Sequence, residues 1–326
     1  MQEDKTYWII DATKISDYQQ CPRSYLFRYL FGWQPSTPSI HLQFGIAWHL
    51  AMEHLLANGY DQDSVDTAID VFTEAFHDGY VMYQGDDHPT KNTASAMYAL
   101  QAYAQTYHDD LQRFEVIATE IAGKVNLTDT KALYFRMDTM CKGSVKDCPP
   151  GYFSLEHKTG SRNDRVWKDQ WLQKTQIGGY NYVLHCVYPA EEVRGVCING
   201  VFPRMPPELK RDGSPRAGAR DVEFTRLLYP KTSLQLEDWY QNTIDWYDSI
   251  LRDTELALAT PEDAPILTAF RKNPEHCTSY FGCPFMDYCH AWPNPIGRAD
   301  IPQQGFVKCF WNPQAMLERA KKVMEV

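Results

Sequence analysis

The chain has 326 residues, of which 44% are hydrophobic and 23% are charged, and its formal net charge at neutral pH is −10. This composition is typical of a folded globular protein and excludes a low-complexity chain. The acidic balance argues against a protein that coats nucleic acid by general phosphate neutralisation, but it leaves room for an enzyme with a local basic surface. The polar start and the lack of about 18 consecutive apolar residues predict a soluble, intracellular protein.

The N-terminal part predicts helices. Residues 23–31 show helical apolar spacing behind Cys21 and Pro22, and Ser16 with Gln19 resembles the capping box that begins a helix. A helix that ends at Gly59 follows. Two longer helical patterns come next, at roughly residues 63–83 and 91–111. We expect residues 50–112 to form a helical insertion ahead of the core.

The middle of the chain predicts a strand-rich core. Segments with alternating or β-branched side chains predict strands at 114–127, 131–141, 151–160, 193–203 and 221–229. Helical patterns lie at about 167–185 and 232–257, and the C-terminal part is irregular, aromatic and rich in cysteine. This order predicts one α/β or α+β domain over residues 1–326. Residues 1–32 and 270–312 are expected to form a single accessory layer on it.

A basic segment separates the last two predicted strands. Residues 204–220 contain only two acidic side chains, and their proline and glycine content indicates an extended loop. Such a loop is either a solvated linker or a surface that contacts a charged substrate. Its basic residues are Arg204, Lys210, Arg211, Arg216 and Arg220.

Two charged side chains end one predicted strand. Glu156 and Lys158 are two residues apart, so they share one face, and Asp138 lies on the preceding strand, about 5 Å away if the strands are adjacent. The pair is either a simple salt bridge or half of an active site. Two carboxylates at that distance repel unless a cation lies between them, and their hard oxygens suit Mg²⁺ or Mn²⁺. A lysine beside such a cation can orient water and stabilise charge on a phosphoryl oxygen.

Two helical positions complete the pattern. His49 follows Gly45 by four residues, and Gln176 and Tyr180 are four apart on another predicted helix. By themselves these spacings are ordinary features of a helix surface. In chain order, however, His49, Asp138, the Glu156-x-Lys158 motif and the Gln176-x-x-x-Tyr180 motif together resemble the PD-(D/E)XK nuclease superfamily in its RecB-like branch.

The resemblance implies roles for these residues. His49, Asp138 and Glu156 would hold Mg²⁺ or Mn²⁺, with the backbone carbonyl of His157 as a further ligand. Lys158 would serve the attacking water, while Gln176 and Tyr180 would hold the DNA or the lysine. The implied fold is a restriction-endonuclease-like core, in which helices flank a central mixed sheet.

Two positions qualify the resemblance. Phe135 stands three residues before Asp138, where the family usually has glycine, so the approach to the metal is expected to differ. Glu120 matches an acidic residue often found on the preceding strand, and we interpret it as structural.

Three of the nine cysteines are evenly spaced near the C-terminal end, at Cys277, Cys283 and Cys289. A tetrahedral metal site needs a fourth ligand. The resemblance extends to AddB-like and CRISPR-adaptation nucleases, which implies that Cys21, in its Cys-Pro-Arg context, completes a [4Fe–4S] cluster. Zinc, bound by four cysteines or with His290 replacing one thiol, is the alternative. The other five cysteines are expected to be buried or incidental: Cys141, Cys148, Cys186, Cys197 and Cys309.

These expectations combine into a metal-dependent DNA nuclease, more specifically an exonuclease of recombination, repair or phage DNA processing. The resemblance also implies a cytoplasmic location in a bacterial or phage-infected cell, and a recombination or single-strand-annealing protein as a partner. Two alternatives remain open at this point: a non-catalytic module that binds DNA or a partner protein, and a site-specific endonuclease.

Overall fold

A computed structural model describes the fold. It covers residues 5–81, 88–145, 148–208, 210, 221–279, 282–315, 317 and 322–325. Among the helices in these ranges, none combines the length and the apolar character needed to cross a membrane.

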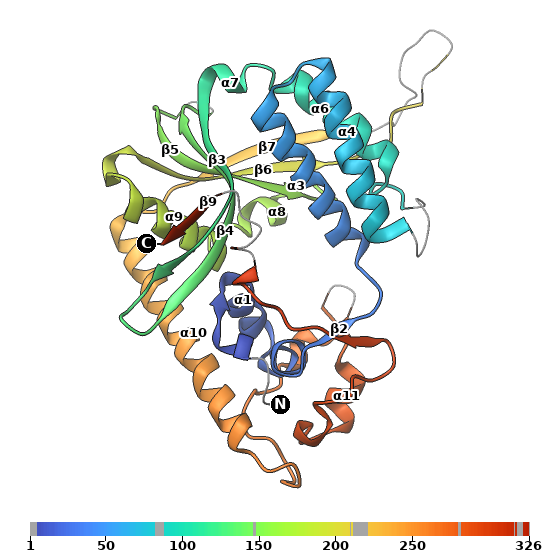
Figure 1. The fold of residues 1–326 in the computed structure, drawn as a ribbon, viewed down its shortest axis with the longest axis vertical. Coiled ribbons are helices and arrows are strands. Elements are labelled where there is room, and N and C mark those ends of the chain that lie inside the picture. Colours follow the sequence, from blue (N-terminus) through green and yellow to red (C-terminus); the bar gives the residue numbers. More distant parts are fainter. Residues whose placement is uncertain are drawn as a thin grey trace.

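A mixed sheet forms the centre of the molecule (Figure 1). Its strand order is β7-β6-β5-β4-β3-β9, and β1 pairs with β4 beside this path. The β5–β6, β3–β9 and β1–β4 pairs are parallel, and the other neighbours are antiparallel. The strands are β1 (Ile10–Asp11), β3 (Phe114–Asn126), β4 (Ala132–Gly143), β5 (Gly151–Thr159), β6 (Val193–Phe202), β7 (Glu223–Tyr229) and β9 (Lys322–Glu325).

Helices cover both faces of this sheet, which confirms the predicted fold class. Alternate residues of β6 face opposite layers: Val196 and Ile198 pack with the cluster that contains α9, whereas Cys197 packs in the cluster that contains Leu56 of α3. The helices around the core are α3 (Ile40–Asn58), α8 (Arg165–Asp169), α9 (Thr175–Val187) and α10 (Ser233–Ala259).

A separate apolar cluster joins α3 to the helices that follow it. Phe44, Trp48, Phe72 and Tyr103 are fully buried there. The elements are α4 (Gln62–Phe76), the π-helical turn η3 (His77–Val81), α6 (Thr93–Thr106) and the short α7 (Asp110–Arg113). Gly59 ends α3 with φ +106°, as its position in the sequence predicts.

The N-terminal segment packs against the C-terminal one. Strand β2 (Trp33–Pro35) pairs antiparallel with β8 (Phe306–Lys308), and Phe27 stacks on Phe285 at a centroid distance of 5.3 Å. The buried Arg23 donates hydrogen bonds to the carbonyls of Phe270, Leu267 and Pro293. The elements here are α1 (Ala12–Gln20), α2 (Pro22–Tyr25), the π-helical η2 (Leu26–Leu30), α11 (Met286–Ala291) and the 3₁₀ turns η1 (Lys5–Trp8), η5 (Pro274–His276) and η6 (Ile296–Arg298). A further 3₁₀ turn, η4 (Ala190–Glu192), lies between α9 and β6.

Two local predictions are wrong. Ser16 does not cap a helix, because α1 already begins after Asp11, whose Oδ1 accepts a hydrogen bond from Lys14 N at 2.7 Å. The expected helix at 167–185 is two helices, because the chain leaves helical geometry between α8 and α9.

Candidate active site

The site lies where two neighbouring strands separate. The β4–β5 ladder runs from Gly143 opposite Gly151 to Thr139 opposite Leu155, and Asp138 and Glu156 are the next residues along each strand. Beyond them, the same edge of β4 pairs with β1 at Leu133 and Tyr134. We call this opening the fork; it places two carboxylates opposite each other on rigid backbone.

Asp138 has a partner for each carboxylate oxygen. Oδ1 lies 3.0 Å from Nδ1 of His49, on α3, and Oδ2 accepts a hydrogen bond from His157 N at 2.7 Å. Burial alone would raise the pKa of Asp138, but the adjacent His49 holds it well below its usual range. Burial likewise opposes the charge on His49, but Asp138 raises the pKa of the imidazole above its ordinary value. This carboxylate is therefore ionised throughout the neutral range.

Glu156 differs from Asp138 in having one unpaired oxygen. Its Oε1 accepts hydrogen bonds from Lys158 Nζ at 2.7 Å and from Gln176 Nε2 at 3.0 Å. Its Oε2 is buried and has no hydrogen-bond partner. Burial, together with the charge of Asp138, raises the pKa of Glu156 to about 7. The unpaired oxygen is an acceptor that a cation can use.

Lys158 is held by two acceptors. Its Nζ donates to Glu156 and also to Gln176 Oε1 at 3.2 Å. Burial opposes the charge, but Glu156 and Asp138 raise the pKa of Lys158 above its ordinary value. The ammonium group is therefore charged and directed into the fork.

Gln176 and Tyr180 connect Lys158 to the backbone of β4. Gln176 Nε2 donates to Tyr180 OH at 2.9 Å, and that hydroxyl donates to the carbonyl of Arg136. Both side chains come from one face of α9, as their spacing predicts.

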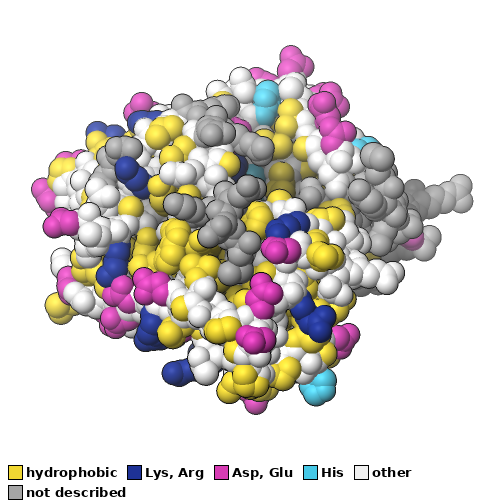
Figure 2. Space-filling model, turned by 60° about the horizontal axis from the view of Figure 1, so that its bottom comes forward, with side chains coloured by type: hydrophobic (Ala, Val, Ile, Leu, Met, Phe, Trp, Pro, Cys, Tyr) yellow, Lys and Arg dark blue, Asp and Glu magenta, His cyan; other side chains and the backbone are white. Residues whose placement is uncertain are grey.

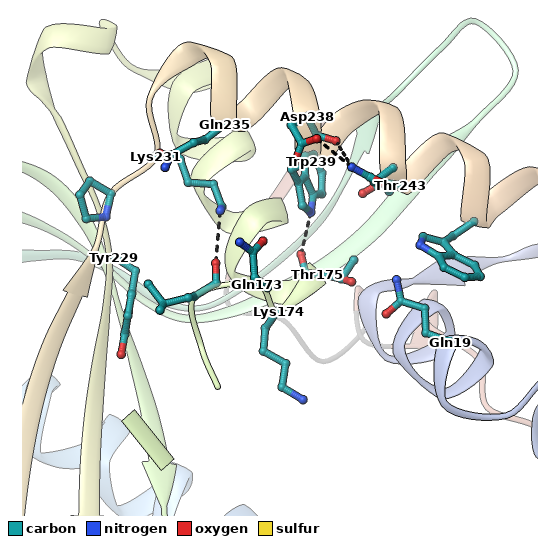
Figure 3. Close-up of a pocket in the computed structure, with 14 residues that line it drawn as sticks. Gln19, Gln173, Lys174, Thr175, Tyr229, Lys231, Gln235, Asp238, Trp239 and Thr243 are labelled. Atoms are coloured by element: carbon teal, nitrogen blue, oxygen red, sulfur yellow. Dashed lines mark hydrogen bonds between the residues drawn. The ribbon is translucent and has the colours of Figure 1, made fainter. Parts of the chain in front are cut away.

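The packing of α10 fixes the start of α9. Trp239 on α10 donates from Nε1 to the carbonyl of Thr175 at 3.1 Å, as Figure 3 shows. A Cβ added at Gly178 would lie 2.0 Å from Cδ1 of the same indole, so only glycine fits. A hollow of about 390 Å³ lies on this side of α9. Figure 3 draws the amide, lysine and aromatic side chains that line it. We assign this hollow no chemistry.

A third carboxylate joins the site. The register of Thr119 with Thr139 and of Ile121 with Met137 places Glu120 opposite Asp138. Ligand atoms of His49, Glu120 and Asp138 all lie within 4.8 Å of one another. Glu120 has a φ of +48° and is ion-paired with Arg136. The sequence alone favours a structural role for Glu120. An acidic side chain in the middle of a predicted strand is the signal that could have marked it as part of the site.

These residues fit a divalent cation. The group of His49, Glu120 and Asp138 offers one imidazole nitrogen and two carboxylates, which suits Mn²⁺ or Mg²⁺. Glu156, opposite Asp138, adds a third carboxylate beside this group. The unpaired buried oxygen of Glu156 is independent support, because such an atom is costly unless something binds it.

The side chain of His157 takes no part in this set. It points to the other layer, where Nδ1 lies 2.9 Å from Nδ2 of Asn199, and burial lowers the pKa of His157 to about 3. Only its backbone faces the fork, through the amide that donates to Asp138.

A cavity of about 330 Å³ opens over the fork. Besides the catalytic candidates, its lining includes Phe135, the residue that replaces the usual glycine, and the exposed side chains Leu42 and Trp311. No sequence motif had marked the last two residues.

The predicted basic surface is only partly visible. Arg204 donates to the carbonyl of Ser161 at 3.1 Å and lies 3.7 Å from Glu223, and Lys210 is exposed. Arg211, Arg216 and Arg220 lie outside the described residues. On the face drawn in Figure 2, the Lys and Arg side chains of the described residues are scattered among Asp and Glu and form no continuous patch.

The four cysteines expected to bind a second cofactor lie around one pocket. Cys21, at the start of α2, meets Cys277, Cys283 and Cys289 around a space of about 210 Å³, with Phe27 and His290 also in its wall. We call this the four-cysteine pocket. Burial raises the pKa of Cys283 and of Cys289. Over the described part of the chain, cysteine sulfurs form no group of three within 4.8 Å.

The remaining cysteines are dispersed. Cys141 and Cys197 are buried, Cys148 is intermediate, and Cys186 and Cys309 are exposed.

Comparison with known families agrees with the geometry. The family profile described as the PD-(D/E)XK nuclease superfamily matches residues 11–290, a range that includes both the fork and the four-cysteine pocket. No curated protein sequence matches the chain.

Proposed function

The chain belongs to the PD-(D/E)XK nuclease superfamily, and from that premise we propose that it is a metal-dependent deoxyribonuclease that cuts DNA from an end. The observation that carries the proposal is the convergence of Asp138, Glu156 and Lys158 at the fork, with an unpaired carboxylate oxygen ready for a cation. A binding module gains nothing from such costly buried charges. We place the enzyme in recombination, repair or phage DNA processing, with DNA as its partner, by resemblance to the RecB-like branch.

His49, Asp138, Glu156 and Glu120 would hold the cation, with the His157 carbonyl as a further ligand. When bound, the cation supplies Lewis acidity toward a phosphoryl oxygen and toward water. Lys158 then has a defined task. Its ammonium group, fixed by Glu156 and Gln176, positions the attacking water and offers positive charge where the phosphoryl oxygens become more negative.

Gln176 and Tyr180 orient that ammonium group. The amide oxygen of Gln176 accepts from Lys158, and its amide nitrogen is held by Glu156 and Tyr180. Tyr180 in turn donates to the Arg136 carbonyl. The position of the Lys158 ammonium group is therefore fixed relative to β4, the strand that carries Asp138. This arrangement costs little reorganisation when the reaction begins.

A [4Fe–4S] cluster is our proposal for the four-cysteine pocket. Tetrahedral zinc with bonds of about 2.3 Å brings its sulfurs to about 3.8 Å from one another. The wider spread of the sulfurs favours a larger cluster. Protein purified without oxygen should then be brown; a colourless protein with one zinc per chain would support zinc instead.

End-labelled linear DNA and closed circular DNA, each incubated with Mg²⁺, Mn²⁺ or EDTA, test the nuclease function. We expect cleavage of the linear DNA that requires a metal and starts at an end. Lys158→Ala should reduce it at least about a hundredfold, whereas Lys231→Ala, which removes a lysine in the hollow beside α9 and α10, should not. Discrete fragments from circles would support a site-specific endonuclease, and metal-independent binding without cleavage would support a binding module.

A further inference from the structure

The mouth of the fork cavity carries exposed apolar side chains. Leu42, in the first turns of α3, is 61% exposed, and Trp311, after β8, is 40% exposed. Both line the same cavity as Asp138, Glu156 and Lys158. Apolar side chains exposed at the edge of a polar cavity offer surface that a bound ligand can cover.

Trp311 is fixed before any substrate arrives. Its Nε1 donates to Asp11 Oδ2 at 2.8 Å, and Asp11 is itself buried as the cap of α1. On either side, Cys309 N donates to the Gly32 carbonyl at 2.7 Å and Gln314 Nε2 donates to Tyr134 OH at 3.1 Å. The only polar atom of the indole is therefore already paired, so Trp311 has ring surface to offer and no hydrogen bond.

The catalytic groups lie below this mouth. Glu156 is 1% exposed and Asp138 is 9% exposed. A phosphodiester that reaches them must bring its own nucleotide into the cavity, because base and phosphate are joined through one sugar. The base then lies within reach of the wall. Inside a duplex both faces of a base are covered by its neighbours, and at a blunt end only the outer face of the last pair is open. An unpaired base can turn either face toward an indole, so a wall of this kind favours an unpaired strand.

We propose that Trp311 stacks on an unpaired base of the strand being cut, that Leu42 packs against the same nucleotide, and that the substrate is therefore single-stranded DNA or a frayed end. This inference rests on the proposed nuclease function and adds the substrate class and two base-contacting residues. Because the Trp311 ring offers no free hydrogen-bonding group, this stacking should not depend on the nucleotide sequence of the strand.

The test combines protein variants with abasic substrates. Single abasic nucleotides are placed in turn at the first few positions of an end-labelled single strand, and cleavage is measured under single-turnover conditions. We expect one position to lower kcat/KM about tenfold for the unmodified protein, the order of one base–aromatic stack. Trp311→Ala should lower kcat/KM about tenfold on the intact strand. On the strand with the abasic nucleotide at that position, the substitution should lower kcat/KM no further.

Further variants separate stacking from a structural role. Trp311→Phe keeps a ring but removes the N–H, so it should recover most of the loss if stacking matters and none if the bond to Asp11 matters. Leu42→Ala should lower kcat/KM about threefold. Trp246→Ala and Leu234→Ala, which remove exposed apolar side chains elsewhere, should leave kcat/KM unchanged. A blunt GC-rich duplex should be cut at least tenfold more slowly than a single strand.

Binding of a fluorescent single strand in EDTA distinguishes the two proposals. If no substrate is cut but the abasic position and Trp311→Ala still weaken binding non-additively, the nuclease function fails and the stacking survives. Additive effects of Trp311→Ala and the abasic position, or equal use of blunt duplex and single strand, would overturn the stacking proposal.

Discussion

The fork and the four-cysteine pocket are built in opposite ways. At the fork, sheet register and the helices α3 and α9 bring the side chains together. Hydrogen bonds among these side chains, and to the backbone at His157 and Arg136, then hold them in position. The pocket instead joins Cys21 to a segment of irregular structure near residues 273–289, through Arg23, Asn273 and stacked aromatic rings. A site on strands can exist without its ion, whereas one made of loops depends far more on the group it binds.

Lys158→Ala gives the largest expected effect and isolates the fork. Cleavage should fall at least about a hundredfold, because a fixed positive charge acting on the transition state is lost. Metal affinity should remain largely intact, since no cation ligand is removed. Single-turnover kinetics with calorimetric metal titration measure both, and near-normal cleavage would mean that the Glu156–Lys158 pair is only a salt bridge.

Cys283→Ala tests whether the stability of the four-cysteine pocket depends on its bound group. We expect loss of the brown colour and a fall of roughly 10 °C in melting temperature, since the bound group contributes directly to folding. Cleavage measured at low temperature should persist, because the fork does not use this thiol. Cys186→Ala, which removes an exposed cysteine, is the matched control. Equal melting temperatures of the two variants would show that the four-cysteine pocket, like the fork, keeps its structure without a bound group.

Gly178→Ala tests how tightly α9 is positioned. The new methyl group would overlap the Trp239 indole, so α9 must move and carry Gln176 and Tyr180 with it. Overpacking of this kind costs about 1–3 kcal/mol, and we expect about a tenfold loss of kcat. At Gly179 the nearest atom to an added Cβ is 3.5 Å away, so Gly179→Ala should be as stable as the parent. Denaturant titration and kinetics of both variants decide the matter.

The smallest expected effect concerns pH. The pKa of Glu156 is raised to about 7 by burial and Asp138, so below that pH a proton competes with the cation. Metal affinity should therefore rise about tenfold between pH 6 and pH 8, with a proton released on binding below neutrality. Calorimetry in buffers of different ionisation enthalpy counts this proton. Glu156→Gln, which mimics the protonated state, should bind weakly and lose this pH dependence.

Sequence patterns predict the fork better than its surroundings. Asp138, Glu156 and Lys158 were predictable because side chains alternate along strands, so spacing alone gives a shared face. Glu120 is harder, since its role depends on the register with β4 and on a positive φ that no local pattern specifies.

Short strands and single contacts escaped prediction for a related reason. Strands β1 and β9 have two and four residues, which is too few to show the alternation of side chains that predicts a strand. They form by pairing with the edges of β4 and β3. Asp11 and Ser16 are both good caps, and only tertiary packing selects the first. Trp311 belongs to no motif. Its place in the cavity wall depends on the pairing of β8 with β2, which brings the following residues to the cavity.

The pairing of β2 with β8 has a consequence for biosynthesis. All the candidate catalytic side chains, from His49 to Tyr180, leave the ribosome well before Phe306–Lys308 does. Until that late strand docks beside Trp33, the indole of Trp311 cannot reach Asp11, and one wall of the cavity is missing. Because domains tend to fold as they are synthesised, we expect the charged residues of the fork to be present in the nascent chain before Trp311 can complete the cavity.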